Sequence, residues 1–249
     1  MILASLICLT LGISLASANV EKTIFLGPEP VNIPDQQPSL SSLNIDTLTP
    51  EDWSLRTHLE AIFPTADFER GRSSWFILDN LTEGQRYEVR ICWLAIQPTA
   101  FHLETHTLPA VFDTPELITS LHNYSTSRQD SPPRKATTRE GERSTGGGEH
   151  LSSVLFLRID AAADYFTTDR ELMRRPEPVL ADVILDPFVL NVLPRTLLPT
   201  VGYVILVAAA SWVLASRLLM PWVRGLMVDG GGGQDDAGRE KREEEKKTR

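Results

Sequence analysis

The chain has 249 residues and a formal net charge of -9 at pH 7. The part up to Arg195 holds 26 acidic and 16 basic residues, and this negative excess argues against nucleic acid or anionic lipid as its main ligand. Of the two cysteines, Cys8 lies in the first apolar run and is expected to leave with it, so Cys92 would have no partner for an internal disulfide. We expect a thiol tucked on a strand, and the alternative is a disulfide with another chain.

Residues 1–18 have the pattern of a secretory signal peptide. The apolar run from Ile2 to Leu15 is followed by the small-x-small motif Ala16-Ser17-Ala18 and then by a polar segment. We expect cleavage between Ala18 and Asn19, because the run is short for a membrane-spanning helix. The alternative is a retained N-terminal anchor, since only the α-amino group supplies positive charge before the run.

The next hundred or so residues are predicted to be β-rich. Lys22–Ile33 begins apolar and then carries prolines, which is typical of an edge strand or an extended arm. Trp53–Phe63 fits a strand by its alternation and also a helix by its apolar stripe. We favour the strand, because the neighbouring segments are β. Phe101–Leu108 alternates in the same way and is predicted to be another strand.

The strongest β signal is the stretch "WFILDNLTEGQRYEVRICWLA", Trp75 to Ala95. Its second half alternates two sets of residues, and period two assigns the first set to the core and the second to an outward face where a partner would bind: Tyr87, Val89, Ile91 and Trp93, against Glu88, Arg90, Cys92 and Leu94. Leu81, Gly84 and Tyr87 have the spacing of the tyrosine corner of a fibronectin type III domain. We therefore predict a mainly β fold over residues 19–195, a fibronectin- or immunoglobulin-like β-sandwich.

The segment after this β-rich part is predicted to begin with a disordered loop and then to become ordered again. Ser125–His150 is polar, with Pro, Gly and charge and no apolar period, so a disordered loop is expected over 125–150. Val154–Ile159 is predicted to be a strand, and Val179–Leu190 is a second apolar stretch.

The residues that could take part in catalysis or metal binding are scattered along the sequence. Asp160, Asp164 and Asp169 lack the glycine and closing glutamate of a calcium loop, and we expect solvated acids. His102 and His106 share a strand face, but no third ligand is evident, which argues against zinc. The sequence therefore assigns no catalytic, cofactor-binding or metal-binding residue.

The run from Thr196 to Ser216 is uncharged and predicts a transmembrane helix, 196–216. As a helix it is about 30 Å long, the thickness of a hydrocarbon core. The alternative, a buried core helix, is disfavoured because nothing of comparable size follows to cover it. With a cleaved signal, the helix gives a type I topology: residues 19–195 in the lumen and a disordered cytosolic tail, 217–249. Arg217 and Arg224 agree with the positive-inside rule.

Two kinds of short signal suggest the secretory pathway. Asn80-Leu81-Thr82 and Asn123-Tyr124-Ser125 are glycosylation sequons, and Asn80 is favoured because it lies at the tip of a turn. Lys246 and Lys247 are the fourth and third residues from the end, similar to the dilysine signal that returns type I proteins to the endoplasmic reticulum. The alternative is a solvated charged tail.

Four stretches are similar to the accessory subunit of fungal GPI mannosyltransferase II: "WSLRTHLEAIFPT", "SWFILDNLTEGQRYEVRICW", "VFDTPELITSLHNYS" and "DVILDPFVLNVLPRTLLPTVGY". The resemblance implies a non-catalytic, stabilising subunit in the endoplasmic reticulum membrane. Its partner would be the multi-spanning mannosyltransferase that adds the second mannose to the GPI-anchor precursor. One alternative is a type I lumenal binding module, a cargo receptor or adhesion-type protein without a role in GPI synthesis. An independent lumenal enzyme is a third hypothesis.

Overall fold

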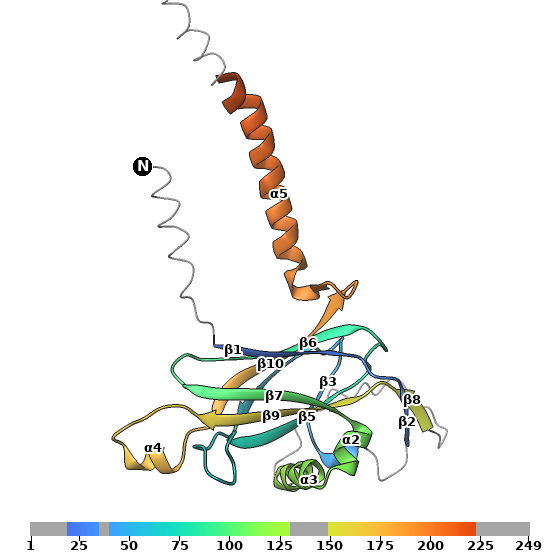
Figure 1. Cartoon of the computed structure of the whole chain (residues 1–249), viewed down its shortest axis with the longest axis vertical. Helices are drawn as coiled ribbons and strands as arrows, with labels where there is room; N and C mark the ends of the chain where they lie inside the picture. The colour runs from blue at the N-terminus through green and yellow to red at the C-terminus, as the bar shows by residue number, and fades with distance from the viewer. Residues whose placement is uncertain (1–18, 35–39, 130–148, 223–249) are drawn as a thin grey trace, which may run out of the picture. The chain divides into compact units, whose positions relative to one another are not determined.

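The computed structural model describes residues 19–34, 40–129 and 149–222 (Figure 1). The chain divides into two compact units, Met1–Arg195 and Thr196–Arg249, and each is described by itself. The predicted signal peptide, most of the predicted loop and the tail with Lys246 and Lys247 lie outside the described residues. Signal cleavage, retrieval and the disorder of residues 223–249 therefore stay predictions. Residues 217–222, predicted as the start of the disordered tail, are helical instead.

The first unit is mainly β, and its larger sheet has the order β1-β6-β10-β4. These antiparallel strands are β1 (Val20–Leu26), β6 (Arg86–Trp93), β10 (Val179–Val189) and β4 (Ser54–Leu59). A short strand, β11 (Leu193–Pro194), folds back on the end of β10. The strand preferred for Trp53–Phe63 is confirmed by β4, and β1 lies at an edge, as the pattern of Lys22–Ile33 predicts.

The second sheet has the order β3-β5-β9-β7. Its strands are β3 (Thr47–Leu48), β5 (Arg72–Leu78), β9 (Leu155–Ala163) and β7 (Thr99–Thr107). A separate pair joins β2 (Val31–Pro34) to β8 (Glu149–Ser152). The strands predicted at Phe101–Leu108 and Val154–Ile159 are confirmed by β7 and β9.

The two sheets share one hydrophobic core. It takes alternate residues from both of them, including Phe76 and Leu78 of β5, Tyr87 and Val89 of β6, and Leu157 of β9. This alternation confirms the core-facing set predicted for β6, because Tyr87, Val89 and Ile91 are fully buried and Trp93 packs against the same cluster.

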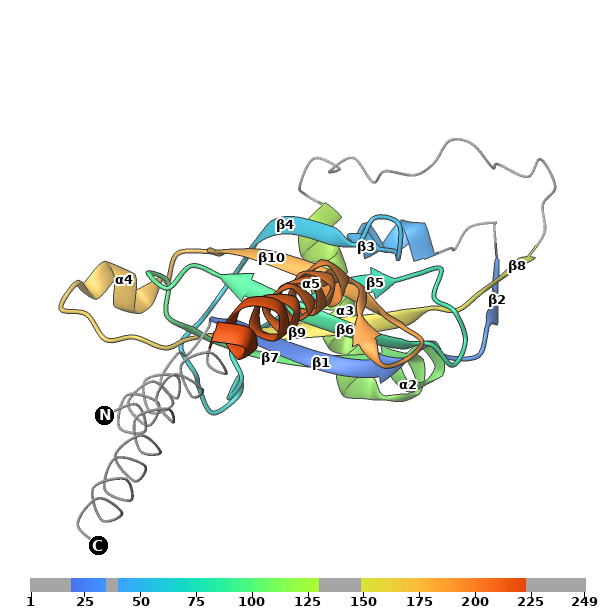
Figure 2. The same ribbon diagram turned by 90° about the horizontal axis from the view of Figure 1, so that it is seen from above.

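Two helices cover the opposite face of the second sheet (Figures 1 and 2). α2 (Leu108–Asp113) is capped by Thr107, and α3 (Pro115–Gln129) follows it. The other short helical elements of the unit are η1 (Leu40–Leu43) and α4 (Arg170–Arg174). The helices bury a second apolar cluster against β5 and β9: Ile33, Trp75, Ile77, Val111, Leu121, Val154 and Phe156.

The predicted boundaries of the disordered loop are wrong at both ends. α3 continues to Gln129 and β8 begins at Glu149, so the 125–150 boundary fails on each side, while residues 130–148 lie outside the described residues. The helix continues through polar sequence because tertiary contacts hold it. The buried Ser125 Oγ donates to Leu43 O at 2.7 Å, and Arg128 pairs with Asp46 at 3.0 Å.

The stretch between β5 and β6 crosses from one sheet to the other and has the geometry of a tyrosine corner. The Thr82 amide donates to Tyr87 Oη at 2.9 Å, and that hydroxyl donates to Gln85 Oε1 at 3.1 Å. Gly84 supplies the left-handed backbone, with φ 69°. Gly27 also lies against the corner. A Cβ atom at this position would lie 2.1 Å from Thr82 O, which is too close for any residue other than glycine.

We expect Tyr87→Phe to lower the free energy of unfolding by about 1 kcal/mol, because the Thr82 amide loses its acceptor while the buried ring remains. Denaturant unfolding of the full chain in detergent, followed by tryptophan fluorescence, measures this. Tyr165→Phe is the matched control, since its hydroxyl makes a longer bond, 3.3 Å to Leu172 O, near the short helix α4. Equal stability of Tyr87→Phe and the parent chain would contradict a structural role for the corner.

The described part of the second unit is one apolar helix. α5 (Leu198–Leu214) follows the 3₁₀ turn η2 (Arg195–Leu197) and runs into the π-helical turn η3 (Ala215–Leu219). The continuous helix, Arg195–Trp222, has 28 residues and is long and apolar enough to cross a membrane. It contains the predicted segment 196–216 and extends beyond it at both ends.

Candidate functional site

The outward face of the larger sheet carries a belt of charged residues that we call the ionic face. It consists of Lys22, Arg56, Glu88, Arg90, Asp182 and Asp186. These residues alternate with core residues on four neighbouring strands, so the pleat places all of them on the side away from the core. The outward set predicted from β6 is therefore part of a wider surface.

Two buried carboxylates lie at the centre of the ionic face. Glu88 and Asp186 are register partners on β6 and β10, and both are buried. Lys22 Nζ lies 3.1 Å from Glu88 Oε2, and Arg90 Nη1 lies 3.6 Å from Glu88 and 3.8 Å from Asp186. Because two carboxylates side by side repel each other, the two cations hold this pair together.

An exposed ion pair extends the ionic face onto β4. Arg56 Nε and Nη2 lie 2.7 and 2.8 Å from the two carboxylate oxygens of Asp182. The hydrogen bond from Arg56 lowers the pKa of Asp182 and raises the pKa of Arg56 itself. This bidentate pair presents fixed charge at the solvent surface, where salt screens it.

Cys92 lies between Val20 and Asp182 in the register of the sheet and is half-buried. Burial raises the pKa of its thiol, although Arg90 opposes the shift. Because the thiolate is the nucleophile, a raised pKa makes this cysteine a poor one. Cys92 lies on a strand, as expected, and its setting does not activate the thiol.

The second sheet carries another charged network on its helix-side face. Asp160 is 1% exposed and accepts from Ser73 Oγ at 2.6 Å, and from Arg158 Nε and Nη2 at 2.9 and 2.7 Å. The prediction of a solvated acid at this position is wrong, because Asp160 lies inside β9 and not at a strand end. Asp169, by contrast, caps α4 by accepting from the Glu171 amide at 2.8 Å.

Glu104 joins this network to two histidines. Its Oε1 lies 2.6 Å from Arg70 Nη1 and 2.9 Å from His102 Nε2. Burial alone would raise the pKa of Glu104, but hydrogen bonds from His102 and Arg70 and the charge of Arg158 outweigh it and lower the pKa to about 2. His106 Nε2 lies 3.6 Å from Glu104 Oε2, and burial lowers the pKa of His106.

We expect the chain to lose stability in acid because of Glu104. Its folded pKa of about 2 lies below the ordinary 4.5, so its contribution is present above about pH 4.5 and is lost as the pH falls toward 2. Glu104→Gln should flatten this limb of a plot of unfolding free energy against pH. Glu60→Gln is the control, because Glu60 also pairs with an arginine, Arg72 at 2.9 Å, at an exposed position. An unchanged limb in Glu104→Gln would contradict the assignment.

The charged groups on the two sheets form networks of ion pairs. Among the described residues, 19–34, 40–129 and 149–222, no three of the types His, Cys, Asp and Glu are grouped to hold a metal ion. The two buried carboxylates that carry most bonds, Asp160 and Glu88, are each bound by cations.

The two sequons lie in different settings. Asn80 is exposed at the corner, with φ 55°, and its side-chain amide lies 3.3 Å from Glu51 Oε2. Asn123 is exposed on α3, where it borders a groove of about 690 Å³ between the helix and β5. The hydroxyl of its sequon serine, Ser125, is buried in a tertiary hydrogen bond. Both asparagines are thus at the surface of the folded domain.

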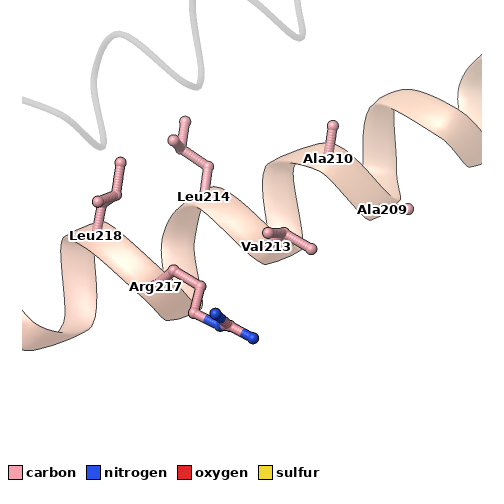
Figure 3. Close-up of a pocket in the computed structure, with 6 residues that line it drawn as sticks. All are labelled: Ala209, Ala210, Val213, Leu214, Arg217 and Leu218. Atoms are coloured by element: carbon pink, nitrogen blue, oxygen red, sulfur yellow. The ribbon is translucent and has the colours of Figure 1, made fainter.

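An apolar hollow lies along α5 and the turn after it (Figure 3). Its lining residues all belong to this one helical run: Ala209, Ala210, Val213, Leu214, Arg217 and Leu218. One helix cannot enclose a ligand. The hollow is a shallow depression on the helix surface where the side chains are small, and small residues allow another helix to approach closely.

Sequence reasoning found only the part of the ionic face on β6. Lys22, Arg56, Asp182 and Asp186 were missed because the face depends on which strands pair. The signal available was the alternation of Asp182 and Asp186 with apolar residues in Val179–Leu190. No protein-family model, no curated protein and no solved structure matches the chain.

Proposed function

We propose that this protein is a single-pass membrane protein that acts as a non-catalytic, stabilising subunit of the GPI mannosyltransferase II complex of the endoplasmic reticulum. Its partner in this proposal is the multi-spanning subunit that adds the second mannose to the GPI-anchor precursor. The identity of that partner is supported by the resemblance of the four stretches named above, which contribute β4, the β5–β6 corner, α2, α3, β10 and the start of α5.

The observation that carries a membrane role is the exposure of α5. None of its described residues is buried, and large apolar side chains such as Ile205, Leu206 and Trp212 are exposed. An apolar surface of this extent is stable only in lipid or against another apolar surface. Gly202 and Ala209 lie two turns apart on α5, which gives another helix a place of close contact.

The β domain in this proposal is a fibronectin-like sandwich that holds the partner's lumenal loops. The tyrosine corner and the shared core of the two sheets support the sandwich. The ionic face supports the holding role, because it offers fixed positive and negative charges on a rigid sheet. Charge complementarity of this kind fixes register and excludes wrong partners more than it adds affinity.

The orientation in the proposal is type I, with the β domain in the lumen. Asn80 would then meet the glycosylation machinery, and its exposed place at the corner supports that. Lys246 and Lys247 would lie in the cytosol and serve as the retrieval signal. If removal of these lysines leaves the protein in the endoplasmic reticulum, the partner retains it, which favours the subunit over a freely moving binding module.

Affinity purification of the full chain in mild detergent, followed by mass spectrometry, tests the proposed function. We expect a multi-spanning mannosyltransferase in the eluate. The matched control replaces Leu198–Leu214 by polyleucine of equal length, which keeps a spanning helix but removes Gly202 and the alanines; it should recover less of the partner. Absence of any multi-spanning glycosyltransferase from the parent eluate would overturn the proposal.

A further inference from the structure

The hairpin between β10 and β11 ends in a tight turn that exposes apolar side chains. Val192 N donates to Val189 O at 3.1 Å across two residues of positive φ, Leu190 at 54° and Asn191 at 58°. Leu190 is 90% exposed and Val192 is 76% exposed. We call Val189–Val192 the hairpin tip.

The hairpin tip is held rigidly by the tyrosine corner. Asn191 Oδ1 accepts from the Arg86 amide at 2.8 Å, and Asn191 Nδ2 donates to Gly84 O at 3.1 Å. Gln85 Nε2 also donates to the carbonyl of Phe188, the residue before the tip, at 3.3 Å. These bonds come from a well-packed segment, so the exposure of the tip is a fixed feature of the fold.

Leucine is an unusual residue for the first central position of such a turn. Both central residues have positive φ, a conformation that glycine, asparagine and aspartate adopt most readily. Asn191 fits this preference, whereas Leu190 strains the backbone and exposes its apolar side chain to water. A residue that is unfavourable both for the turn and for solvent indicates that its side chain meets something other than water.

The tip is close in the chain to the apolar helix. Arg195, where the helix begins, is the third residue after Val192, and a residue spans at most about 3.5 Å, which limits the separation to about 10 Å. The headgroup layer on each side of a bilayer is about 5 to 7 Å thick. If the helix spans a membrane, the tip is therefore within reach of the lipid surface, whichever way the helix leaves Arg195.

We propose that the hairpin tip inserts Leu190 and Val192 into the lipid surface next to the start of the helix. The occupant of this apolar patch is the boundary between headgroups and acyl chains of the bilayer. Leu26 supports the assignment, because it is exposed and is the register partner of Arg86, whose amide holds the tip. The contact would hold the β domain against the membrane at its corner end. This inference rests on the proposed membrane-spanning role of the helix.

Spin labels on single-cysteine chains test the inference. In a background of Cys8→Ser and Cys92→Ser, labels are placed by Val192→Cys at the tip, Ile96→Cys as the matched control and Val207→Cys in α5. Ile96 is 84% exposed and follows the far end of β6, which has 8 residues and is about 25 Å long. The full chain is reconstituted in phosphatidylcholine vesicles, and collisions with oxygen and with a water-soluble nickel chelate are compared.

We expect the label at 192 to be severalfold less accessible to the nickel chelate than the label at 96. Equal accessibility at 192 and 96, with the label at 207 in lipid, would overturn the inference and leave the proposed function intact. A label at 207 that is open to the chelate would instead overturn the membrane-spanning role. Protection at 192 that appears only after a multi-spanning mannosyltransferase is added would assign the tip to a protein partner and overturn the lipid assignment.

A second variant removes the apolar side chain of Leu190 while preserving the turn. Leu190→Asn suits the left-handed backbone, so the fold should be retained, with unfolding no easier than in the parent. Combined with the label at 192, it should raise nickel accessibility toward that of position 96. No rise in the folded variant would count against insertion of Leu190.

Discussion

Replacing Asp160 by alanine is expected to destabilise the chain by about 3 to 5 kcal/mol, the cost of breaking a buried charge pair by removing one partner. The carboxylate is almost fully buried and takes two hydrogen bonds from Arg158 and one from Ser73. After the change, the mostly buried guanidinium of Arg158 loses its two shortest contacts and keeps Glu104 at 3.9 Å. A loss of this size is between about a fifth and all of the roughly 5 to 15 kcal/mol that typically stabilises a domain.

The chain contains a matched control for this change. Asp182 and Arg56 make the same bidentate contact, with two nitrogen-to-oxygen distances of 2.7 and 2.8 Å. The side chain of Asp182 is 32% exposed, however, and that of its arginine is 71% exposed. Asp182→Ala should therefore change stability little, because water replaces the lost contact and salt already screens the pair.

Denaturant midpoints of Asp160→Ala, Asp182→Ala and the parent chain, measured in the same detergent, give the comparison. Asp160→Asn adds a second control, since the amide can still accept from Ser73 but cannot neutralise Arg158. It should fall between the parent and Asp160→Ala. If Asp160→Ala and Asp182→Ala lose similar stability, burial is not what makes the Asp160 network important.

The strands were predictable because their alternation is local. β6 and β9 keep apolar residues at every second position, and β4 and β7 do so with threonine at some of these positions. The pleat alone then assigns one set to the core. The corner was predictable for a related reason, since Leu81, Gly84 and Tyr87 lie within seven residues and its hydrogen bonds join Thr82 and Gln85 to Tyr87. These parts of the fold need no knowledge of distant contacts.

The helices could not be predicted in the same way. α3 fully buries only Leu121 and Ser125, and its apolar stripe of Leu117, Leu121 and Tyr124 is short for a helix of 15 residues. It is held by side chains from distant segments, such as Asn44 Nδ2, which donates to Arg128 O at 2.9 Å. Such contacts outweigh weak local preference, and they are invisible in a polar stretch read by itself.

The ionic face was predictable only in part, because it also depends on contacts between residues that are far apart in the chain. The outward position of Glu88 and Arg90 follows from alternation on β6. Their neighbours, Lys22 and Asp186, come from strands 66 and 98 residues away from Glu88 in the chain, and only the register brings them together. Burial of Glu88 was also unexpected, because an outward face predicts exposure.

Trp75→Ala is expected to cost about 3 to 5 kcal/mol, the range for removing a large buried aromatic side chain. Trp75 is fully buried on the helix side of β5, and its ring lies 6.1 Å from Phe156 in an edge-to-face arrangement. Its Nε1 donates to Ser120 Oγ of α3 at 3.1 Å. One side chain therefore joins the sheet to the helix by both packing and a hydrogen bond.

The location of this loss can be measured by hydrogen exchange. Because Trp75 contributes to the cluster under α2 and α3 and not to the core between the sheets, amides of α3 should lose protection before those of β6. Trp75→Phe is the control: it keeps an aromatic ring in the cluster but loses the bond to Ser120 and part of the packing, so it should cost less than Trp75→Ala. Equal loss of protection in α3 and β6 would show instead that the helices and the two sheets unfold as one unit.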